Sequence, residues 1–181
     1  MTPLRSVLAI GIAGALSACF TSETPFLADS DTVRIADGPI RVCSDKDDCS
    51  RAEPGETGKG YVILPPPDED ERPIPVRFAP LTDSALGPVW LAEIDMSEDD
   101  DRAFIVGVAR RAPEYDADGL MGFDLELPWC GDVSPEDRET YGIVKIDEYT
   151  CALPSKTSIA DYLREAHRLD FDNPDWWEEQ N

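Results

Sequence analysis

The sequence predicts a mainly β (α+β) domain: an antiparallel sheet or half-barrel of about six to eight short strands, one C-terminal helix and two disulfides. Three observations lead to this fold class. Short apolar segments alternate with polar or Gly/Pro turns, one amphipathic stretch lies near the C-terminus, and four cysteines follow the N-terminal region.

The chain is strongly acidic. Its 181 residues include 16 Lys and Arg against 38 Asp and Glu, for a formal charge of −22, and 41% are hydrophobic. That length and apolar content favour one domain with a core. The charge repels polyanions, so we expect neither nucleic acid nor an anionic lipid surface as a partner. A dispersed acidic surface often reflects a saline medium, so the charge need not mark a binding site.

The chain divides into four expected regions. They are a signal peptide at 1–18, a flexible tether at 19–31, a β-rich domain at 32–169 and an acidic, aromatic tail at 170–181. The tether is expected because its residues show no hydrophobic periodicity.

The first strands are expected around a turn. Thr32–Ala36 and Pro39–Cys43 alternate on either side of Asp37-Gly38, a pair typical of a β-hairpin. Further short apolar runs, rich in Val, Ile, Phe and Trp, follow at 61–64, 74–81, 89–94, 103–109, 123–129 and 143–146. Each is too short for a free-standing helix, which favours strands.

The residue patterns of two of these segments predict how each strand is buried. Ala103–Ala109 is apolar throughout, which indicates a central strand covered on both faces. Phe123, Leu125 and Leu127 alternate with Asp124 and Glu126, which indicates one buried and one solvated face. No internal repeat is present.

One helix is predicted at 158–169. Thr157 or Ser158 can cap it, and Arg164, His167 and Arg168 suit its C-terminal dipole. Residues with helical spacing form its apolar face: Ile159, Tyr162, Leu163, Ala166 and Leu169.

Four cysteines beyond the N-terminal region predict two disulfides. Three connectivities are possible, and pairing of nearest neighbours favours Cys43 with Cys49 and Cys130 with Cys151. Each would stabilise the fold by about 2 to 4 kcal/mol, chiefly through the unfolded state. Their spacings do not suit structural zinc.

The N-terminus has the layout of a secretory signal peptide. Arg5 precedes an apolar run, and the uncharged stretch from Ser6 to Phe20 is 15 residues long. This is shorter than the roughly 20 residues that a membrane-spanning helix needs.

The tetrad Leu16-Ser17-Ala18-Cys19 resembles the lipobox of bacterial lipoprotein precursors. The resemblance implies that diacylglycerol is attached to Cys19, that cleavage occurs before it, and that the new amino group is acylated, with palmitate as a typical acyl group. Phe20, rather than Asp, follows the cysteine, which implies transfer to the outer membrane, facing the periplasm or the cell surface. Ordinary cleavage after Ala13-Gly14-Ala15 is the alternative, but it leaves an odd cysteine in an oxidising compartment.

Catalytic constellations are hard to assemble from this sequence. The one histidine, His167, is expected as a solvated residue near the helix end rather than as part of a Ser-His-Asp triad. With 38 acids, some carboxylates meet by chance, so we assign no catalytic pair.

Calcium is a further possibility. Asp116 and Asp118 stand at alternating positions before Gly119, as at the start of an EF-hand loop, but Leu125 occupies the twelfth position. An Asp-Gly turn explains the same residues. The acidic run at 95–101 is expected as a solvated loop between strands. We expect no cofactor.

The tail places Trp176 and Trp177 among acids. Such aromatic residues either fold back onto their own domain, which we favour, or insert into a partner. They are the residues we nominate for partner binding.

The leading hypothesis is a non-enzymatic, membrane-anchored envelope lipoprotein that acts as an interaction or accessory module, with an envelope protein as its partner. The alternative is a cation- or small-ligand-binding module that uses the acidic loops. A carboxylate-dependent envelope hydrolase ranks third.

Overall fold

Seven strands close into a mixed barrel in the computed structural model, which describes residues 20–45, 48–56, 58–66, 72–98 and 101–179. The strands follow one another around the barrel in chain order, each antiparallel to the last, and a parallel β2–β8 pair closes it. An odd number of alternating strands requires one parallel pair. The barrel strands are β2 (Ile40–Cys43), β3 (Cys49–Pro54), β4 (Tyr61–Ile63), β5 (Ile74–Ser84), β6 (Gly87–Asp95), β7 (Phe104–Arg111) and β8 (Met121–Glu126).

The predicted fold class is confirmed, and closure goes beyond the expected half-barrel. The barrel interior is filled by alternate side chains of its strands, including Val76, Phe78, Ile105 and Phe123. The expectation for 103–109 also holds, because every residue of β7 from Phe104 to Arg110 is buried.

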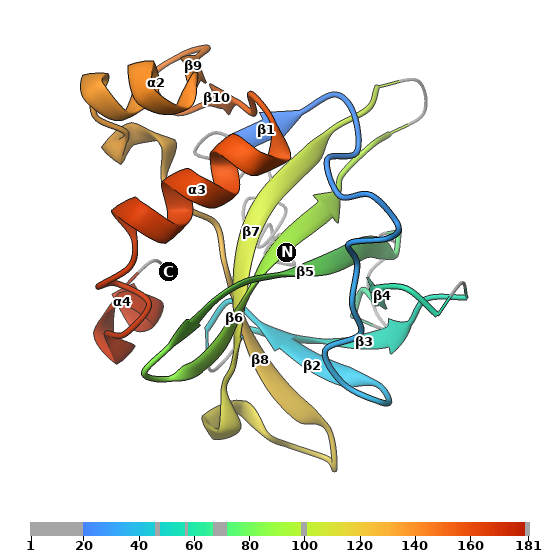
Figure 1. Cartoon of the computed structure of the whole chain (residues 1–181). Coiled ribbons are helices and arrows are strands. Elements are labelled where there is room, and N and C mark those ends of the chain that lie inside the picture. The colour runs from blue at the N-terminus through green and yellow to red at the C-terminus, as the bar shows by residue number, and fades with distance from the viewer. Residues whose placement is uncertain (1–19, 46–47, 57, 67–71, 99–100, 180–181) are drawn as a thin grey trace, which may run out of the picture.

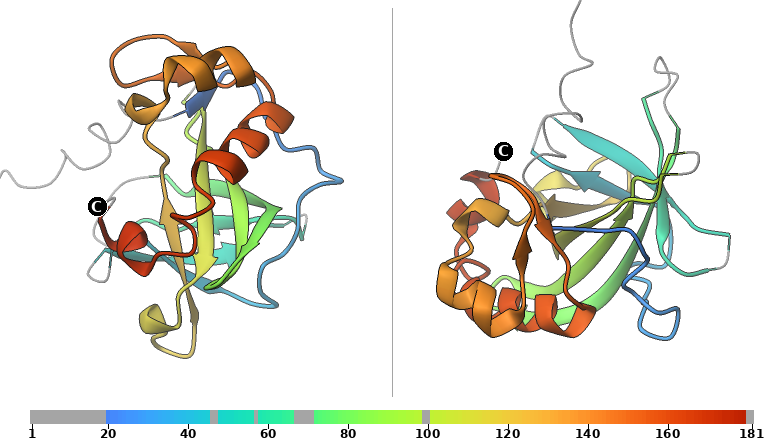
Figure 2. Two further views of the ribbon diagram at one scale, coloured as in Figure 1. Left: turned by 60° about the vertical axis from the view of Figure 1, so that its left-hand side comes forward. Right: turned by 90° about the horizontal axis from the view of Figure 1, so that it is seen from above.

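A second layer covers the outer face of β5, β6 and β7 (Figures 1 and 2). Leu91 and Val108 project outward from the barrel into a core shared with Leu163 and Trp177. The elements of this layer are β1 (Phe20–Ser22), α2 (Pro135–Tyr141), β9 (Val144–Lys145), β10 (Cys151–Ala152), α3 (Lys156–Ala166) and α4 (Pro174–Glu179). Short 3-10 turns lie at Pro113–Tyr115 and Cys130–Asp132.

Both predicted disulfides are confirmed. Cys43–Cys49 joins β2 to β3 across their turn, and Cys130–Cys151 joins the segment after β8 to β10. The Cys130–Cys151 bridge connects β10 of the outer layer to the segment that follows β8.

The hairpin expected at Asp37-Gly38 is wrong. Residues 32–36 form no strand, and β2 pairs instead with β3 across the disulfide-closed turn. The hydroxyl of Tyr61 donates to Ala36 O at 2.7 Å and accepts from Ala36 N at 2.9 Å. A side chain therefore satisfies backbone groups that a strand partner would otherwise satisfy.

The expected tether at 19–31 is wrong for the residues described. Phe20 and Leu27 are buried in the outer core, and β1 pairs with both β7 and β10. The backbone N–H groups of Phe26 and Leu27 donate to Glu93 Oε2 at 2.5 and 2.8 Å. Two buried apolar side chains and a buried carboxylate thus hold this segment on the barrel.

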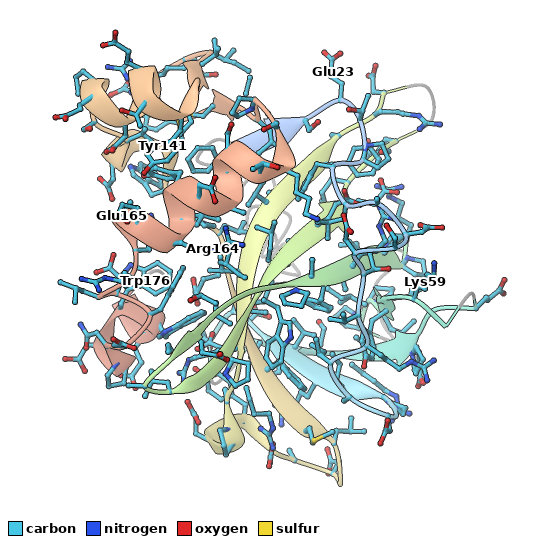
Figure 3. All side chains as sticks on the ribbon, viewed as in Figure 1. Glu23, Lys59, Tyr141, Arg164, Glu165 and Trp176 are labelled. Atoms are coloured by element: carbon cyan, nitrogen blue, oxygen red, sulfur yellow. A yellow bond between two sulfur atoms is a disulfide. The ribbon has the colours of Figure 1, made fainter. Side chains whose placement is uncertain are left out.

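The predicted helix at 158–169 corresponds to α3, which begins and ends at other residues than expected. Ser155, rather than Thr157 or Ser158, is the N-cap and accepts from Ser158 N at 3.1 Å. The helix ends at Ala166, so Leu169 lies beyond it and is 73% exposed. Arg164 Nε donates to Leu81 O at 2.7 Å and ties α3 to β5 (Figure 3).

The solvated face expected on β8 is also wrong. Asp124 and Glu126 are 0% and 3% exposed. Their alternation with apolar residues marks a polar face, but Trp177 of α4 is packed beside that face, on the cross-strand neighbour Arg110.

Candidate functional site

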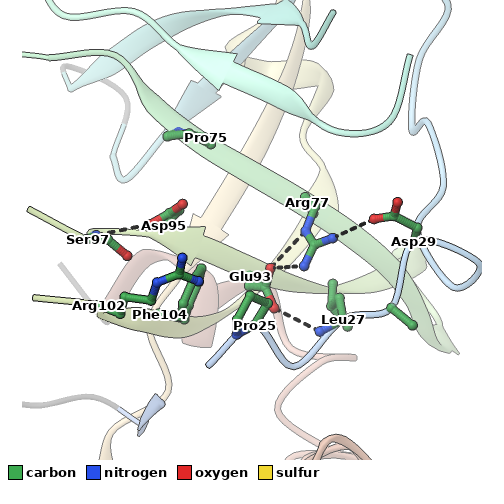
Figure 4. A pocket seen from close by; sticks show the side chains of 11 residues that line it. Pro25, Leu27, Asp29, Pro75, Arg77, Glu93, Asp95, Ser97, Arg102 and Phe104 are labelled. Atoms are coloured by element: carbon green, nitrogen blue, oxygen red, sulfur yellow. Dashed lines mark hydrogen bonds and ion pairs between the residues drawn. The ribbon is translucent and has the colours of Figure 1, made fainter. Parts of the chain in front are cut away.

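The described residues contain a groove of about 650 Å³ between the N-terminal segment and the outer face of the barrel (Figure 4). Segment 25–29 forms one wall, and strands β5, β6 and β7 form the floor. This volume falls in the range of small-molecule sites. Its lining residues are Pro25, Leu27, Ala28, Asp29, Pro75, Arg77, Glu93, Asp95, Ser97, Arg102 and Phe104.

A partly buried ion pair organises the groove floor. Arg77 on β5 lies directly opposite Glu93 on β6 and donates from Nε to Glu93 Oε1 at 2.8 Å, with a second bond from Nη2. Its Nη1 donates to Asp29 Oδ1 at 3.0 Å. Glu93 is 2% exposed and accepts four hydrogen bonds in all, two from Arg77 and two from segment 26–27. The pair therefore fixes the wall against the floor, because a buried carboxylate must be compensated.

The acidic loop after β6 reaches the groove. Asp95 and Ser97 line it, and Asp95 Oδ1 accepts from Ser97 N at 3.0 Å. Arg102 contributes an exposed cation on the other side of this loop. The groove thus presents both charge signs, which suits a polar ligand or a protein side-chain patch. Asp99 and Asp100 of the same loop lie outside the described residues.

A second buried charge cluster lies beneath α4. Arg110 on β7 is paired with Asp124 on β8, and its Nη2 donates to Asp124 Oδ2 and Glu114 Oε1, both at 3.0 Å. The Arg110 guanidinium carbon lies 5.2 Å from the centroid of the Trp177 ring, a cation–π contact. Glu126, two residues along β8 from Asp124, is also buried.

Burial dominates the electrostatics of this cluster. Loss of solvation raises the pKa of Asp124 to about 6, although Arg110 and a hydrogen bond with the Glu126 side chain both act to lower it. A carboxylate hydrolase needs two carboxyls in unlike environments, whereas Asp124 and Glu126 are both buried. Here Asp124 is fully buried, so the cluster serves the packing of β7, β8 and α4 in this structure.

The solvated position expected for His167 is wrong. His167 is 9% exposed, and its Nδ1 lies 2.9 Å from Asp170 Oδ2. The imidazole packs edge-on against Tyr162 and lies 5.6 Å from the Trp176 ring centroid. The chain turns back after α3, which carries the histidine inward with the aromatic residues that follow.

The two tail tryptophans occupy different environments. Trp177 is fully buried against Phe171 and Arg110, so it docks on its own domain, as favoured from the sequence. Trp176 is half-buried between α3 and α4, with its ring centroid 4.9 Å from that of Trp177 (Figure 3). Only Trp176 retains an exposed edge.

The calcium candidates lie in a tight turn. Asp116 accepts from Arg111 Nη2 and from Gly122 N, both at 2.7 Å, and these bonds lower its pKa. Asp118 and Gly119 have φ angles of 55° and 76°, so they form the left-handed corner of the turn that an Asp-Gly pair suits. Within the part of the chain that the structure describes, no group of three or more His, Cys, Asp or Glu could hold a metal ion.

Exposed apolar side chains gather at one end of the molecule. Trp129, Val144, Ile146 and Tyr149 are 40%, 60%, 61% and 43% exposed. The rings of Trp129 and Tyr149 are 6.0 Å apart, and the other two residues belong to the β9–β10 hairpin that carries Tyr149. We call these four residues the hairpin patch.

The lipidation residue Cys19 and the signal peptide at 1–18 lie outside the described residues. No helix among the described residues is long and apolar enough to cross a membrane.

Sequence reasoning missed the groove and both buried charge clusters. One signal was available: Glu93 and Arg110 each stand within or beside an otherwise apolar strand, where an isolated charge needs a partner. The identity of that partner depends on strand pairing, which the sequence does not state.

No family model, curated protein or solved structure matches this chain.

Proposed function

We propose that this chain is a membrane-anchored bacterial envelope lipoprotein that acts as a non-enzymatic interaction module. The proposal rests on the lipobox-like tetrad at 16–19 and on the cysteine pairing of the domain that follows. Disulfides persist in the oxidising compartment where an exported domain would reside. Phe20 after the cysteine favours the outer membrane.

The observation that carries the proposal is the tetrad Leu16-Ser17-Ala18-Cys19, which directly follows an apolar run. Phe20 is the first residue of β1 and belongs to the outer core, one position after Cys19. Cleavage before Cys19 would therefore leave every described element intact.

Metabolic labelling with a tritiated fatty acid tests the anchor. We expect the full chain to incorporate label and Cys19→Ala to incorporate none, because only the thiol of Cys19 is available for the thioether. The double variant Cys43→Ala/Cys49→Ala is the matched control, since it removes two thiols and should still be labelled. Undiminished labelling of Cys19→Ala would refute the anchor.

We propose the groove as a partner-binding surface and the exposed edge of Trp176 as a separate second contact site. The groove combines an apolar floor at Phe104 with charges of both signs, and mixed surfaces of this kind suit protein partners. Because Trp177 is fully buried, we assign it to holding α4 in place beside Trp176.

Site-specific photo-crosslinking tests the partner. A photoreactive residue at Arg102 or at Trp176 should trap one envelope protein reproducibly, whereas one at Arg51, exposed on β3, should not. Equal adducts at all three positions, or none above an untagged control, would remove support for an interaction module.

A second candidate function is small-ligand or cation binding in the groove. It is favoured by the volume of the groove and by Asp95 and Ser97, which the acidic loop contributes to its lining. Thermal melts with millimolar calcium and with chelator give a direct test. A melting shift no larger than that of sodium at equal ionic strength would exclude the calcium form.

A further inference from the structure

We infer that the hairpin patch rests on the interface of a bilayer with no net charge, held there by lipid on Cys19. This inference deepens the proposed function and rests on it. The contact would fix how the domain stands on the membrane and which surface it turns to partners.

Covalent geometry limits the distance between lipid and domain. Successive Cα atoms are about 3.8 Å apart, so the Cα of Cys19 lies within that distance of the Cα of Phe20. Phe20 is fully buried and paired with Cys151, while Thr21 pairs with Ile105 on β7. No slack separates the acylated residue from the barrel. The bilayer surface must therefore pass close to the start of β1.

Strand register identifies which side chains meet that surface. β1 and β10 are parallel, with Phe20 opposite Cys151 and Thr21 opposite Ala152. Phe20 therefore lies at the start of β10, the end that directly follows Tyr149 and Thr150 in the chain. On the neighbouring strand, Ile146 N donates to Thr150 O at 2.9 Å, which brings Ile146 to the same end.

The exposed apolar side chains are concentrated at this end. The described residues expose six large hydrophobic side chains, and four of them form the hairpin patch; the other two are Met121 and Leu169. The Cys130–Cys151 disulfide holds Trp129 beside β10, and the Trp129 ring contacts Tyr149. Trp and Tyr favour the headgroup level of a bilayer because their rings are apolar with one polar group.

Charge at the hairpin selects the type of lipid. Asp147 accepts from Tyr149 N and Thr150 N, both at 2.8 Å, and these bonds lower its pKa. Its carboxylate therefore stays charged near neutral pH, next to the exposed Glu148. Lys145 offsets one of these two charges. A zwitterionic headgroup accommodates this arrangement, whereas an anionic lipid surface repels it.

Fluorescence quenching by brominated lipid tests the contact. The full-length acylated protein is placed in vesicles of phosphatidylcholine brominated on its acyl chains, and Trp129→Phe is measured in parallel. The difference between the two proteins reports Trp129 alone among the four Trp residues. We expect bromolipid to remove more than half of this difference signal, and vesicles with added phosphatidylglycerol to reduce the quenching.

Matched variants separate patch contact from anchoring. Val144→Ser/Ile146→Ser should lessen the quenching of Trp129, while Leu169→Ser, which removes an exposed leucine outside the patch, should leave it unchanged. The native protein and both variants should carry the same lipid label. Both residues of the double variant are exposed, so its fold should persist.

The outcomes distinguish this inference from the proposal beneath it. Labelled protein whose Trp129 is not quenched would overturn the membrane contact and leave the lipoprotein standing. A photo-crosslink from Tyr149 to a protein, with Trp129 unquenched, would assign the patch to a protein partner instead. Absence of label on the native chain would overturn both.

Discussion

Replacement of Asp124 by Asn should flatten the pH dependence of stability. The carboxyl of Asp124 is fully buried, and its pKa rises from 3.8 to about 6 in the folded protein. Asn keeps the shape of the side chain but cannot ionise. The folded wild-type protein therefore holds a proton that the unfolded chain releases between these two pH values.

The sign and size follow from proton linkage. A raised pKa contributes stability that is fully present below pH 3.8 and is lost as pH rises through about 6. About two pKa units, at roughly 1.4 kcal/mol each, correspond to about 3 kcal/mol. Between pH 3.5 and 7, the free energy of unfolding of the wild type should fall relative to that of the variant by this amount.

Urea unfolding of residues 20–181 at a series of pH values measures the effect. Asp83→Asn is the matched control, because it removes one acid from an exposed position on β5 and changes the net charge equally. The free energy of unfolding of the control should depend on pH in the same way as that of the wild type. If the free energy of unfolding of Asp124→Asn also followed the pH dependence of the wild type, burial would not be what raises the pKa of this carboxyl.

The remaining predictions concern core packing, the two disulfides and the buried carboxylate of Glu93. Trp177→Ala should lower the free energy of unfolding by about 3 to 5 kcal/mol, since it empties a fully buried site; urea unfolding measures this, and a loss below 1 kcal/mol would contradict the packing. Loss of the Cys130–Cys151 bridge, which spans 21 residues, should cost about 3 kcal/mol by the same assay. Loss of the shorter bridge at Cys43 should cost about 2 kcal/mol, and the reverse order would contradict the loop-entropy argument. Glu93→Gln should speed proteolysis within segment 25–29; an unchanged cleavage rate would show that the carboxylate does not hold this wall.

The strands β4 to β8 could be predicted because their cause is local. Short apolar runs bounded by turn residues indicated each of them, and the apolar run of β7 predicted its burial on both faces. Cysteine spacing likewise sufficed for the two disulfides. Closure of the barrel could not be predicted, because the parallel β2–β8 pair joins Cys43 to Asp124 with no local signal between them.

The groove depends on such long-range contacts, because Glu93 on β6 is held by Arg77 of β5 and by backbone N–H groups of segment 26–27. The same is true of the charge cluster around Asp124. The burial of Asp124 follows from Arg110 across the strand and from the tail helix near it, and alternation along β8 alone indicates neither. The helix α2 did carry a local signal, with Ser134 as N-cap and Gly142 in the left-handed conformation at its end, but its short polar sequence gave no apolar face. Its packing against α3 in the outer layer depends on tertiary contacts.

The anchor on Cys19 is the central claim, and intact mass spectrometry of the protein extracted from its native membranes tests it most directly. The account predicts a chain that begins at Cys19 and carries a diacylglycerol and an N-terminal acyl group, with both disulfides formed. An unmodified chain that begins after Ala15, or one that retains Met1, would contradict it.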